Sequence, residues 1–262
     1  FQVDADVKVN TNAEKYVAWC WKANGTGSAN TDGSINTAAT SANTTSGFSI
    51  MTYEGNETAS TLGHGLGVVP KFTKTLGAVG YIMAYHVGIT ADKALFLNLN
   101  NAPEDSANHF NDTEPTSSVI SLGNGTDTND TGEDHVAYCW ADVQGFSKFG
   151  SYTGNGNADG TFVYTGFRPA MVIFKQYNAS GEKWYLFDSK RNPFNLTNEL
   201  LMIDVTSAES VNTTGAPIDI LSNGFKIRGT DAAGNGSGAS YIYASWAEAP
   251  FVNSKGVPCN AR

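Results

Sequence analysis

The sequence predicts an all-β protein built from two tandem antiparallel β-sandwich modules of the jelly-roll or concanavalin-like kind. Short segments rich in aromatic and β-branched residues, such as 48–53 and 161–165, have the composition of strands. Asn-Gly and Asp-Gly pairs separate these segments, and such pairs favour tight hairpin turns. Sustained helical spacing of apolar residues over a dozen positions is absent. Many short strands with frequent turns are typical of packed antiparallel sheets.

An internal duplication predicts the number of modules. The segment GFSI at 47–50 recurs as GFSK at 145–148, and both lead into a tyrosine followed by Gly-Asn. The closing motif at 135–141 recurs at 241–247. The copies are separated by 98 residues at the start and 106 at the end. This period is too long for a solenoid and indicates tandem domains. A single larger sandwich made from two half-copies is the alternative.

The duplication places the expected boundaries. We expect a first sandwich at 47–144 and a second at 145–251, joined without a Pro-rich or Ser-rich linker and therefore closely coupled. Residues 252–262 form a polar C-terminal tail. In the N-terminal segment 1–46, the closing motif appears at 16–21 without an opening half before it. We therefore expect this stretch to be the last strand of a preceding module.

The cysteines follow the same repeat. Cys20 and Cys139 occupy matched positions in the closing motif, where the third copy has Ser245. The interchange with serine favours a buried small side chain over a disulfide, since the repeats supply no pair of partners. The third cysteine, Cys259, lies in the polar tail.

Composition excludes some classes of partner. The net charge is -9 and only 16% of residues are charged. An acidic chain without Lys or Arg clusters disfavours electrostatic binding to nucleic acid or anionic membranes. The sequence also lacks an apolar stretch of the roughly 20 residues that a membrane helix needs.

Catalytic signatures are few, and we expect no enzyme. None of the four histidines stands in a zinc-binding spacing, and nucleophile-elbow, P-loop and dinucleotide motifs are absent. His135 matches Tyr241 of the next repeat, which favours a structural aromatic over a catalytic base. The acidic pairs 104–105 and 133–134 lie in turn-like surroundings. A glycosidase carboxylate pair remains the alternative, because such groups meet only in space.

Two kinds of binding site are candidates. The acidic loop 127–134 offers oxygen ligands for calcium, but it lacks the EF-hand pattern and its counterpart at 230–235 has few carboxylates. We therefore expect an exposed turn and no cofactor, with calcium as the alternative. Aromatic residues near turns can stack on sugar rings as lectin platforms do. The candidates for glycan stacking are Tyr81, Tyr85, His86, Tyr177 and Trp184.

These motifs together resemble a repeated β-rich module of uncharacterised function in tail-fibre-like proteins of marine bacteriophages. The resemblance covers most of the chain after Tyr16. It is carried by the segments 16–25, 30–34, 41–50, 63–71, 145–155, 164–169 and 247–254.

The resemblance implies a virion surface protein, either a tail fibre or a receptor-binding component, that attaches to a host surface glycan or protein. By analogy with fibres it also implies a homo-oligomer, in particular a trimer, in contact with other virion proteins. The family has no established catalytic residues to transfer. Two alternatives are a structural decoration or filament subunit without a ligand, and a tailspike-type enzyme that degrades glycans.

Overall fold

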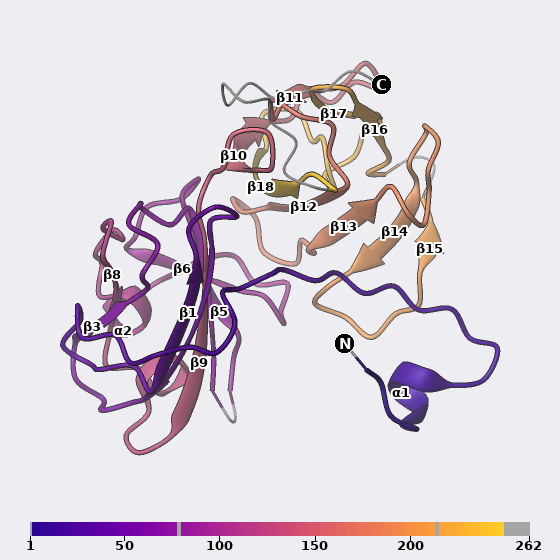
Figure 1. The fold of residues 1–262 in the computed structure, drawn as a ribbon. Helices are drawn as coiled ribbons and strands as arrows, with labels where there is room; N and C mark the ends of the chain where they lie inside the picture. The colour runs from indigo at the N-terminus through magenta and orange to yellow at the C-terminus, as the bar shows by residue number, and fades with distance from the viewer. Residues whose placement is uncertain (1, 78–79, 213–214, 249–262) are drawn as a thin grey trace.

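Two antiparallel β modules make up the computed structural model, which describes residues 2–77, 80–212 and 215–248 (Figure 1). The described helices are single turns, α1 (Val7–Asn10), α2 (Ala107–Phe110) and α3 (Thr126–Asn129). Within these ranges, no helix is long and apolar enough to cross a membrane. The expected all-β class with two antiparallel modules is confirmed. The predicted tail 252–262 and Cys259 lie outside the described residues.

The first module has one large sheet and one small sheet. The large sheet has the order β1-β2-β9-β4-β5-β6-β7, and β3 pairs with β8 in the small sheet. Every pairing within these sheets is antiparallel. The strands are β1 (Ala39–Asn43), β2 (Phe48–Glu54), β3 (Ser60–Gly63), β4 (Phe72–Leu76), β5 (Met83–His86), β6 (Lys93–Phe96), β7 (Glu104–Asp105), β8 (Val119–Leu122) and β9 (Asp134–Trp140).

The second module repeats this plan. Its large sheet has the order β10-β18-β12-β13-β14-β15, and its small sheet the order β11-β17-β16. The strands are β10 (Ser147–Thr153), β11 (Phe162–Tyr164), β12 (Met171–Gln176), β13 (Tyr185–Asp188), β14 (Glu199–Met202), β15 (Ser210–Val211), β16 (Ile218–Leu221), β17 (Gly224–Ile227) and β18 (Ser240–Trp246).

Strand registers show that the sequence repeat is a structural repeat. Trp140 of β9 lies opposite Phe72, which lies opposite His86. Trp246 of β18 lies opposite Met171, which lies opposite Asp188. The order β2-β9-β4-β5 therefore recurs as β10-β18-β12-β13. His86 and Asp188 consequently hold equivalent positions in the two modules.

A buried asparagine closes the same loop in each module. The Asn129 side chain accepts from the Asn56 N–H at 2.9 Å and donates to the Gly123 carbonyl at 2.8 Å. Asn235 accepts from the Asn155 N–H at 2.9 Å and donates to the Gly229 carbonyl at 2.9 Å. Both side chains are fully buried. The repeated Gly-Asn after β2 and β10 thus marks one half of a hydrogen-bonded pair.

The side chains of each large sheet alternate between two cores, one within the module and one between the modules. On β18, Tyr241 and Tyr243 pack against the small sheet of the second module. Ile242 and Trp246 point the opposite way, into a cluster that also contains residues of β2, β4 and β9. The small sheet of the first module packs on a core of its own. Each module therefore has a separate core, and the two large sheets bury their other faces against each other.

His135 has the structural role that its match with Tyr241 predicts. Its ring stacks on Tyr53 at 5.2 Å, as Tyr241 stacks on Tyr152 at 4.8 Å. His135 Nε2 accepts from the Asp130 N–H at 3.1 Å, and the Tyr241 hydroxyl accepts from the Gly236 N–H at 2.8 Å. The two rings therefore share a stacking partner and an accepted backbone N–H, although the Tyr241 hydroxyl also donates to the Ala232 carbonyl.

Replacing His135 with tyrosine is expected to leave the fold intact. The hydroxyl can take over the acceptor role of Nε2, so we expect the free energy of unfolding at pH 7 to change by no more than about 1 kcal/mol. Burial lowers the pKa of His135, so His135→Tyr should also lose less stability in acid than the parent chain. Urea denaturation at pH 7 and pH 5 measures both effects. A loss of several kcal/mol at pH 7 would contradict the equivalence of the two positions.

The N-terminal segment differs from its expected role. Residues 16–23 form no strand, although a closing strand of an earlier module was expected there. They alternate between exposed and partly buried side chains, as an extended chain does, and they are fixed by side-chain hydrogen bonds. Asn43 Nδ2 donates to the Lys22 carbonyl at 3.1 Å, and Ser41 Oγ accepts from the Asn24 N–H at 3.0 Å. Strand β1 lies between these residues and β2, inside the segment that was expected to precede the first sandwich.

The cysteine prediction holds for one of its two described members. Cys139 is fully buried, as is Ser245 at the matched position, and burial raises the pKa of the Cys139 thiol. Cys20 is exposed. Both cysteines are free thiols. The difference arises because Cys20 lies on an extended segment with one face in solvent, whereas Cys139 lies on a strand covered on both faces.

Candidate functional site

Three copies of the closing motif meet where the two modules touch. Trp21, Trp140 and Trp246 hold the same position in the three occurrences of the motif and form the tryptophan cluster. Their ring centroids are 5.8 Å apart for Trp21 and Trp140, 5.3 Å for Trp21 and Trp246, and 6.3 Å for Trp140 and Trp246. All three contacts are edge-to-face, an arrangement that aromatic quadrupoles favour. The motif copies therefore converge on a single aromatic cluster.

Residues 18–23, which we call the strap, carry Trp21 into this cluster. The chain leaving α1 crosses between the modules before it reaches β1 (Figure 1). Trp19 and Trp21 point inward and are partly buried, whereas Cys20 and Lys22 are exposed. Two hollows border the strap. We call them the inter-module cleft and the strap groove.

The inter-module cleft has a volume of about 580 Å³. Apolar side chains of both large sheets line it, including Ile50, Leu97 and Ile173. Its polar lining includes Lys74, whose Nζ lies 4.6 Å from the centre of the Tyr138 ring, and burial lowers the pKa of that lysine. The cleft is thus an apolar gap between the two sheets, with the strap along one side.

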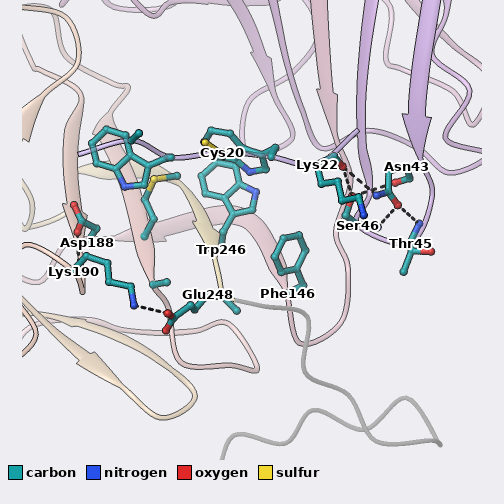
Figure 2. A pocket seen from close by; sticks show the side chains of 16 residues that line it. Cys20, Lys22, Asn43, Thr45, Ser46, Phe146, Asp188, Lys190, Trp246 and Glu248 are labelled. Atoms are coloured by element: carbon teal, nitrogen blue, oxygen red, sulfur yellow. Dashed lines mark hydrogen bonds and ion pairs between the residues drawn. The ribbon is translucent and has the colours of Figure 1, made fainter. Parts of the chain in front are cut away.

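The strap groove has a volume of about 460 Å³ and a mixed lining (Figure 2). Met171 and Trp246 supply a buried apolar floor, and the partly exposed rings of Trp19 and Phe146 stand beside it. Polar residues lie at both ends. They are Lys22, Asn43, Thr45 and Ser46 at one end, and Asp188, Lys190 and Glu248 at the other (Figure 2).

The carboxylates of the groove each face a cation. Glu248 forms an ion pair with Lys190, which is drawn in Figure 2. Asp188 Oδ2 accepts from Arg191 Nε at 2.6 Å, and its other oxygen accepts from the Lys190 N–H at 2.9 Å. Asp188 is buried, so this pairing compensates the loss of hydration of its charge. Asp188 therefore holds the turn after β13 in place at the edge of the groove.

The opposite end of the groove is a turn held by Asn43. Its side-chain oxygen accepts from the N–H groups of Thr45 and Ser46, both at 3.1 Å. Its amide nitrogen and the Ser46 hydroxyl both donate to the Lys22 carbonyl. These bonds attach the strap to the first module and leave the Lys22 side chain exposed. The groove thus offers partly exposed rings between two polar ends.

Three of the five predicted stacking residues are buried. Tyr85 is 2% exposed and its hydroxyl donates to Glu114, while His86 is 1% exposed. Trp184 is 2% exposed, and its Nε1 donates to the Phe96 carbonyl at 2.7 Å. His86 and Trp184 nevertheless line the inter-module cleft with their small exposed surface, whereas Tyr85 lines neither hollow. Burial here comes from the sheet packing, since Tyr85 and His86 lie on β5, Trp184 directly precedes β13, and both strands lie inside their sheets with covered faces.

Tyr81 and Tyr177 retain open surface. Tyr81 is 45% exposed and packs edge-to-face on Phe96 at 5.2 Å. Tyr177 is partly buried against the cluster between the sheets. The two residues are not brought together in the strap groove or the inter-module cleft. Stacking on a ligand stays a prediction for this pair.

His86 joins the two modules. Its Nε2 donates to the Tyr243 carbonyl of β18 at 2.9 Å, and its Nδ1 accepts from the Gly88 N–H at 2.9 Å. Phe72 and Phe149, one from each module, pack edge-on to its ring. Burial lowers the pKa of His86 to about 4.

This contact predicts a loss of stability in mild acid. His86 stays neutral in the folded state down to about pH 4, whereas in the unfolded chain it takes up a proton near pH 6.5. Its contribution is complete above pH 6.5 and is lost as the pH falls toward 4, by about 3 kcal/mol in total. We expect the free energy of unfolding, measured in urea at pH 7.5 and 4.5, to fall less for His86→Phe than for the parent. An equal fall in both proteins would contradict the assignment.

The acidic loop has no assembled cation site. Asp127 accepts from the Tyr81 N–H at 2.9 Å, and Asn129 is buried in the loop-closing pair. Across the described part of the chain, no three His, Cys, Asp or Glu side chains are grouped so as to hold a metal ion.

Sequence reasoning missed the strap groove. Of the residues that line it, none was among the predicted site residues. A signal existed in the three aligned tryptophans of the closing motif, because side chains repeated at matched positions of a duplicated fold occupy equivalent places in space. That signal identifies the tryptophan cluster but not the other residues that line the groove, since Asn43, Phe146 and Lys190 are distant from each other along the chain.

The comparisons with known proteins give one result. A family described as Domain of unknown function (DUF7483) matches residues 1–250, which include both modules and the strap. Searches of the curated proteins and of the solved structures found no significant match. The match to the family spans nearly the whole chain. The protein therefore belongs to the DUF7483 family, whose function is unknown.

Proposed function

We propose that this chain is part of a bacteriophage virion surface protein, a tail fibre or receptor-binding component, that attaches to a host surface glycan or protein through the strap groove. The phage context is supported by the resemblance of the repeated motifs to tail-fibre-like proteins. The observation that carries the binding role is the groove itself, with partly exposed Trp19 and Phe146 between two polar ends.

The chemistry of the groove favours a glycan over a peptide. Sugar rings have apolar faces that stack on aromatic side chains, and hydroxyl edges that hydrogen-bond to amides, hydroxyls and charged groups. The groove offers both kinds of group within one hollow, including Asn43 and Thr45 at one end and Lys190 at the other. The acidic net charge of -9 disfavours strongly anionic polymers, so we expect a neutral or weakly charged saccharide.

Attachment through such a groove is weak for one copy and strong for several. A half-open hollow of this size buries only a few sugar units, so each contact is readily reversible. Display of several copies on one particle raises the effective concentration of the next contact. The trimer implied by analogy with fibres supplies this multivalency in the proposal.

The test is binding of a fluorescent fusion of residues 1–262 to a panel of marine bacterial cells, with purified surface polysaccharide as competitor. Phe146→Ala, which removes a groove ring, is expected to weaken binding at least about tenfold. Tyr81→Ala removes a partly exposed ring outside the groove and is the matched control. Saturable binding that is lost with competitor and with Phe146→Ala, but not with Tyr81→Ala, supports the proposal.

Lys190→Gln gives a second groove variant if Phe146→Ala perturbs folding. The Lys190 side chain is 68% exposed, so its replacement is expected to leave the fold intact. Equal binding by the parent and both groove variants would exclude the groove. Loss with Tyr81→Ala alone would move the ligand to the Tyr81 surface.

A structural role is the second candidate. Large apolar side chains are exposed on the second module, namely Phe162, Tyr164, Phe194 and Val211. Such surfaces favour contacts with neighbouring subunits, as in a virion decoration or a filament. A well-folded protein that binds no cell in the panel would leave this role in place.

A tailspike-type enzyme is the third candidate. Asp188 and Glu248 are the carboxylates of the groove, and both have cationic partners. Release of reducing sugar from the competing polysaccharide, lost in Asp188→Asn or Glu248→Gln, would favour this activity over simple attachment.

A further inference from the structure

Strands β3 and β11 hold equivalent positions but differ in what lies beside them. Leu62 of β3 and Val163 of β11 are the buried central residues of their strands. Each strand follows a Gly-Asn turn and pairs on one side with the next strand of its small sheet, β8 or β17. The residues facing outward are Thr61 in β3 and Phe162 in β11.

In the first module, an extended segment covers the other edge of β3. Ile35 forms a parallel bridge with Leu62, and its N–H donates to the Thr61 carbonyl at 3.1 Å. Ser34 and Thr61 exchange two further bonds, from each backbone N–H to the other side-chain hydroxyl, both at 2.9 Å. Ile35 is buried, whereas Ser34 and Asn36 are exposed. Residues 34–36 thus act as an added strand, and Ile35 enters the core.

In the second module, none of the residues that the structure describes covers the matching edge of β11. Alternate residues of this strand direct their backbone groups toward β17. The Thr161 carbonyl accepts from the Ile227 N–H, and the Thr165 N–H donates to the Asn223 carbonyl. The backbone of Phe162 therefore faces the other way. Within the described residues, no hydrogen bond reaches the Phe162 backbone from that side.

Chain connectivity explains the difference. In the first module, residues 22–46 separate the closing motif from β2, which is long enough to reach β3. In the second module, residues 142–146 make the same connection and turn directly into β10. The second module therefore has no segment of its own at this place in the sequence. An open strand edge is a template for pairing with another chain.

The outer face of β11 is also apolar. Phe162 is 44% exposed and Tyr164 is 65% exposed, whereas their counterparts in β3 are Thr61 and Gly63. Two exposed aromatic rings on a short edge strand give the side chains of an added strand a surface to pack on.

We propose that the β11 edge binds an extended segment of another polypeptide chain, added parallel to β11 as residues 34–36 are added to β3. The segment has a hydroxyl residue that accepts from the Phe162 N–H, followed by a β-branched apolar residue that turns toward Val163. Strand addition of this kind takes its affinity from main-chain hydrogen bonds and its specificity from alternate side chains. The inference is independent of the strap groove, which lies on other elements.

The probe is a synthetic peptide of residues 28–38, since this sequence contains the segment that covers β3. The full chain is titrated with the peptide, and amide hydrogen exchange is followed residue by residue. We expect weak saturable binding that slows exchange of the Phe162 amide at least about tenfold, through the new hydrogen bond. The same peptide with Ile35→Asp is the matched control and is expected not to bind, because a charge would face the core.

Two variants of the exposed residue Phe162 test the geometry. Phe162→Thr restores the hydroxyl of Thr61 and is expected to tighten peptide binding about threefold to tenfold, the range for one added hydrogen bond. Phe162→Pro removes the N–H on the open edge without altering the bonds to β17, and is expected to weaken binding by a similar factor. Unchanged far-UV circular dichroism of both variants confirms that their strands form.

Three results would overturn the proposal. They are no binding at about 1 mM peptide, slowed exchange confined to β3, and equal affinity of the parent, Phe162→Thr and Phe162→Pro for the peptide.

Discussion

Replacing Trp246 with alanine is expected to lower the free energy of unfolding by about 3–5 kcal/mol, the range for truncating a buried tryptophan. Trp246 is 4% exposed and contacts Trp21 of the strap, Trp140 of the first module and Phe149 of its own sheet. Because these three groups belong to different parts of the chain, the loss should also weaken the coupling between the modules. We expect a transition that is no longer cooperative across the whole protein.

The placement of the tryptophans makes this measurable. All five tryptophans of the chain lie in the cluster between the large sheets or pack against it. Their fluorescence therefore reports the contact between modules, while far-UV circular dichroism reports all strands. In guanidinium chloride we expect the two probes to coincide for the parent chain and to separate for Trp246→Ala.

Phe225→Ala is the matched control for this experiment. Phe225 is fully buried in the core of the second module and takes no part in the cluster between the sheets. We expect its loss to reduce stability by a comparable amount. Two results would contradict the proposed role of the tryptophan cluster. One is that the fluorescence and dichroism transitions separate as much in Phe225→Ala as in Trp246→Ala. The other is that the two transitions coincide in Trp246→Ala.

Replacing Asn235 with alanine is expected to cost about 3 kcal/mol of stability. Its side chain is fully buried and accepts from the Asn155 N–H. Its amide group donates to Asn155 Oδ1 and to the carbonyls of Asn157 and Gly229, at 2.8 to 2.9 Å. Alanine removes all of these bonds. Asn155 Oδ1 still accepts from the Asn157 N–H, but the Gly229 carbonyl loses its bond to Asn235 at a buried site, and an unpaired buried group costs about 1–3 kcal/mol.

Urea denaturation followed by circular dichroism measures this loss. Asn129→Ala removes the equivalent group from the first module, and we expect a loss of the same order. Asn157→Ala is the control on the same loop, because its exposed side chain accepts only from the Asp159 N–H. We expect that variant to remain within about 0.5 kcal/mol of the parent. Similar values for Asn235→Ala and Asn157→Ala would refute the structural role of the buried pair.

Local patterns in the sequence predict the fold class and the repeat. Turn pairs and β-branched segments determine that the chain forms short strands, because these residues fit extended backbone and tight turns wherever they occur. The repeat also aligned His135 with Tyr241, and the strand registers confirm this match. Such equivalences follow from sequence because duplicated segments keep the same register.

Other features depended on contacts between distant residues. The strap has the alternating pattern of a strand, yet it pairs with no sheet, because the pattern fixes which side chains share a face but not what covers that face. Trp184 and Tyr85 read as surface aromatics near turns, and only the packing of the sheets buried them.

The sequence by itself therefore determined the all-β class, the repeat and the residues that share each face. The tertiary structure decided which faces were buried, where the three matched tryptophans met and which strand edge has no neighbour among the described residues. The physical reason is the distance along the chain over which each effect acts. Backbone preference and side-chain alternation act over a few residues, whereas the groove joins Asn43, Phe146 and Lys190, and the cover of β3 joins Ile35 to Leu62.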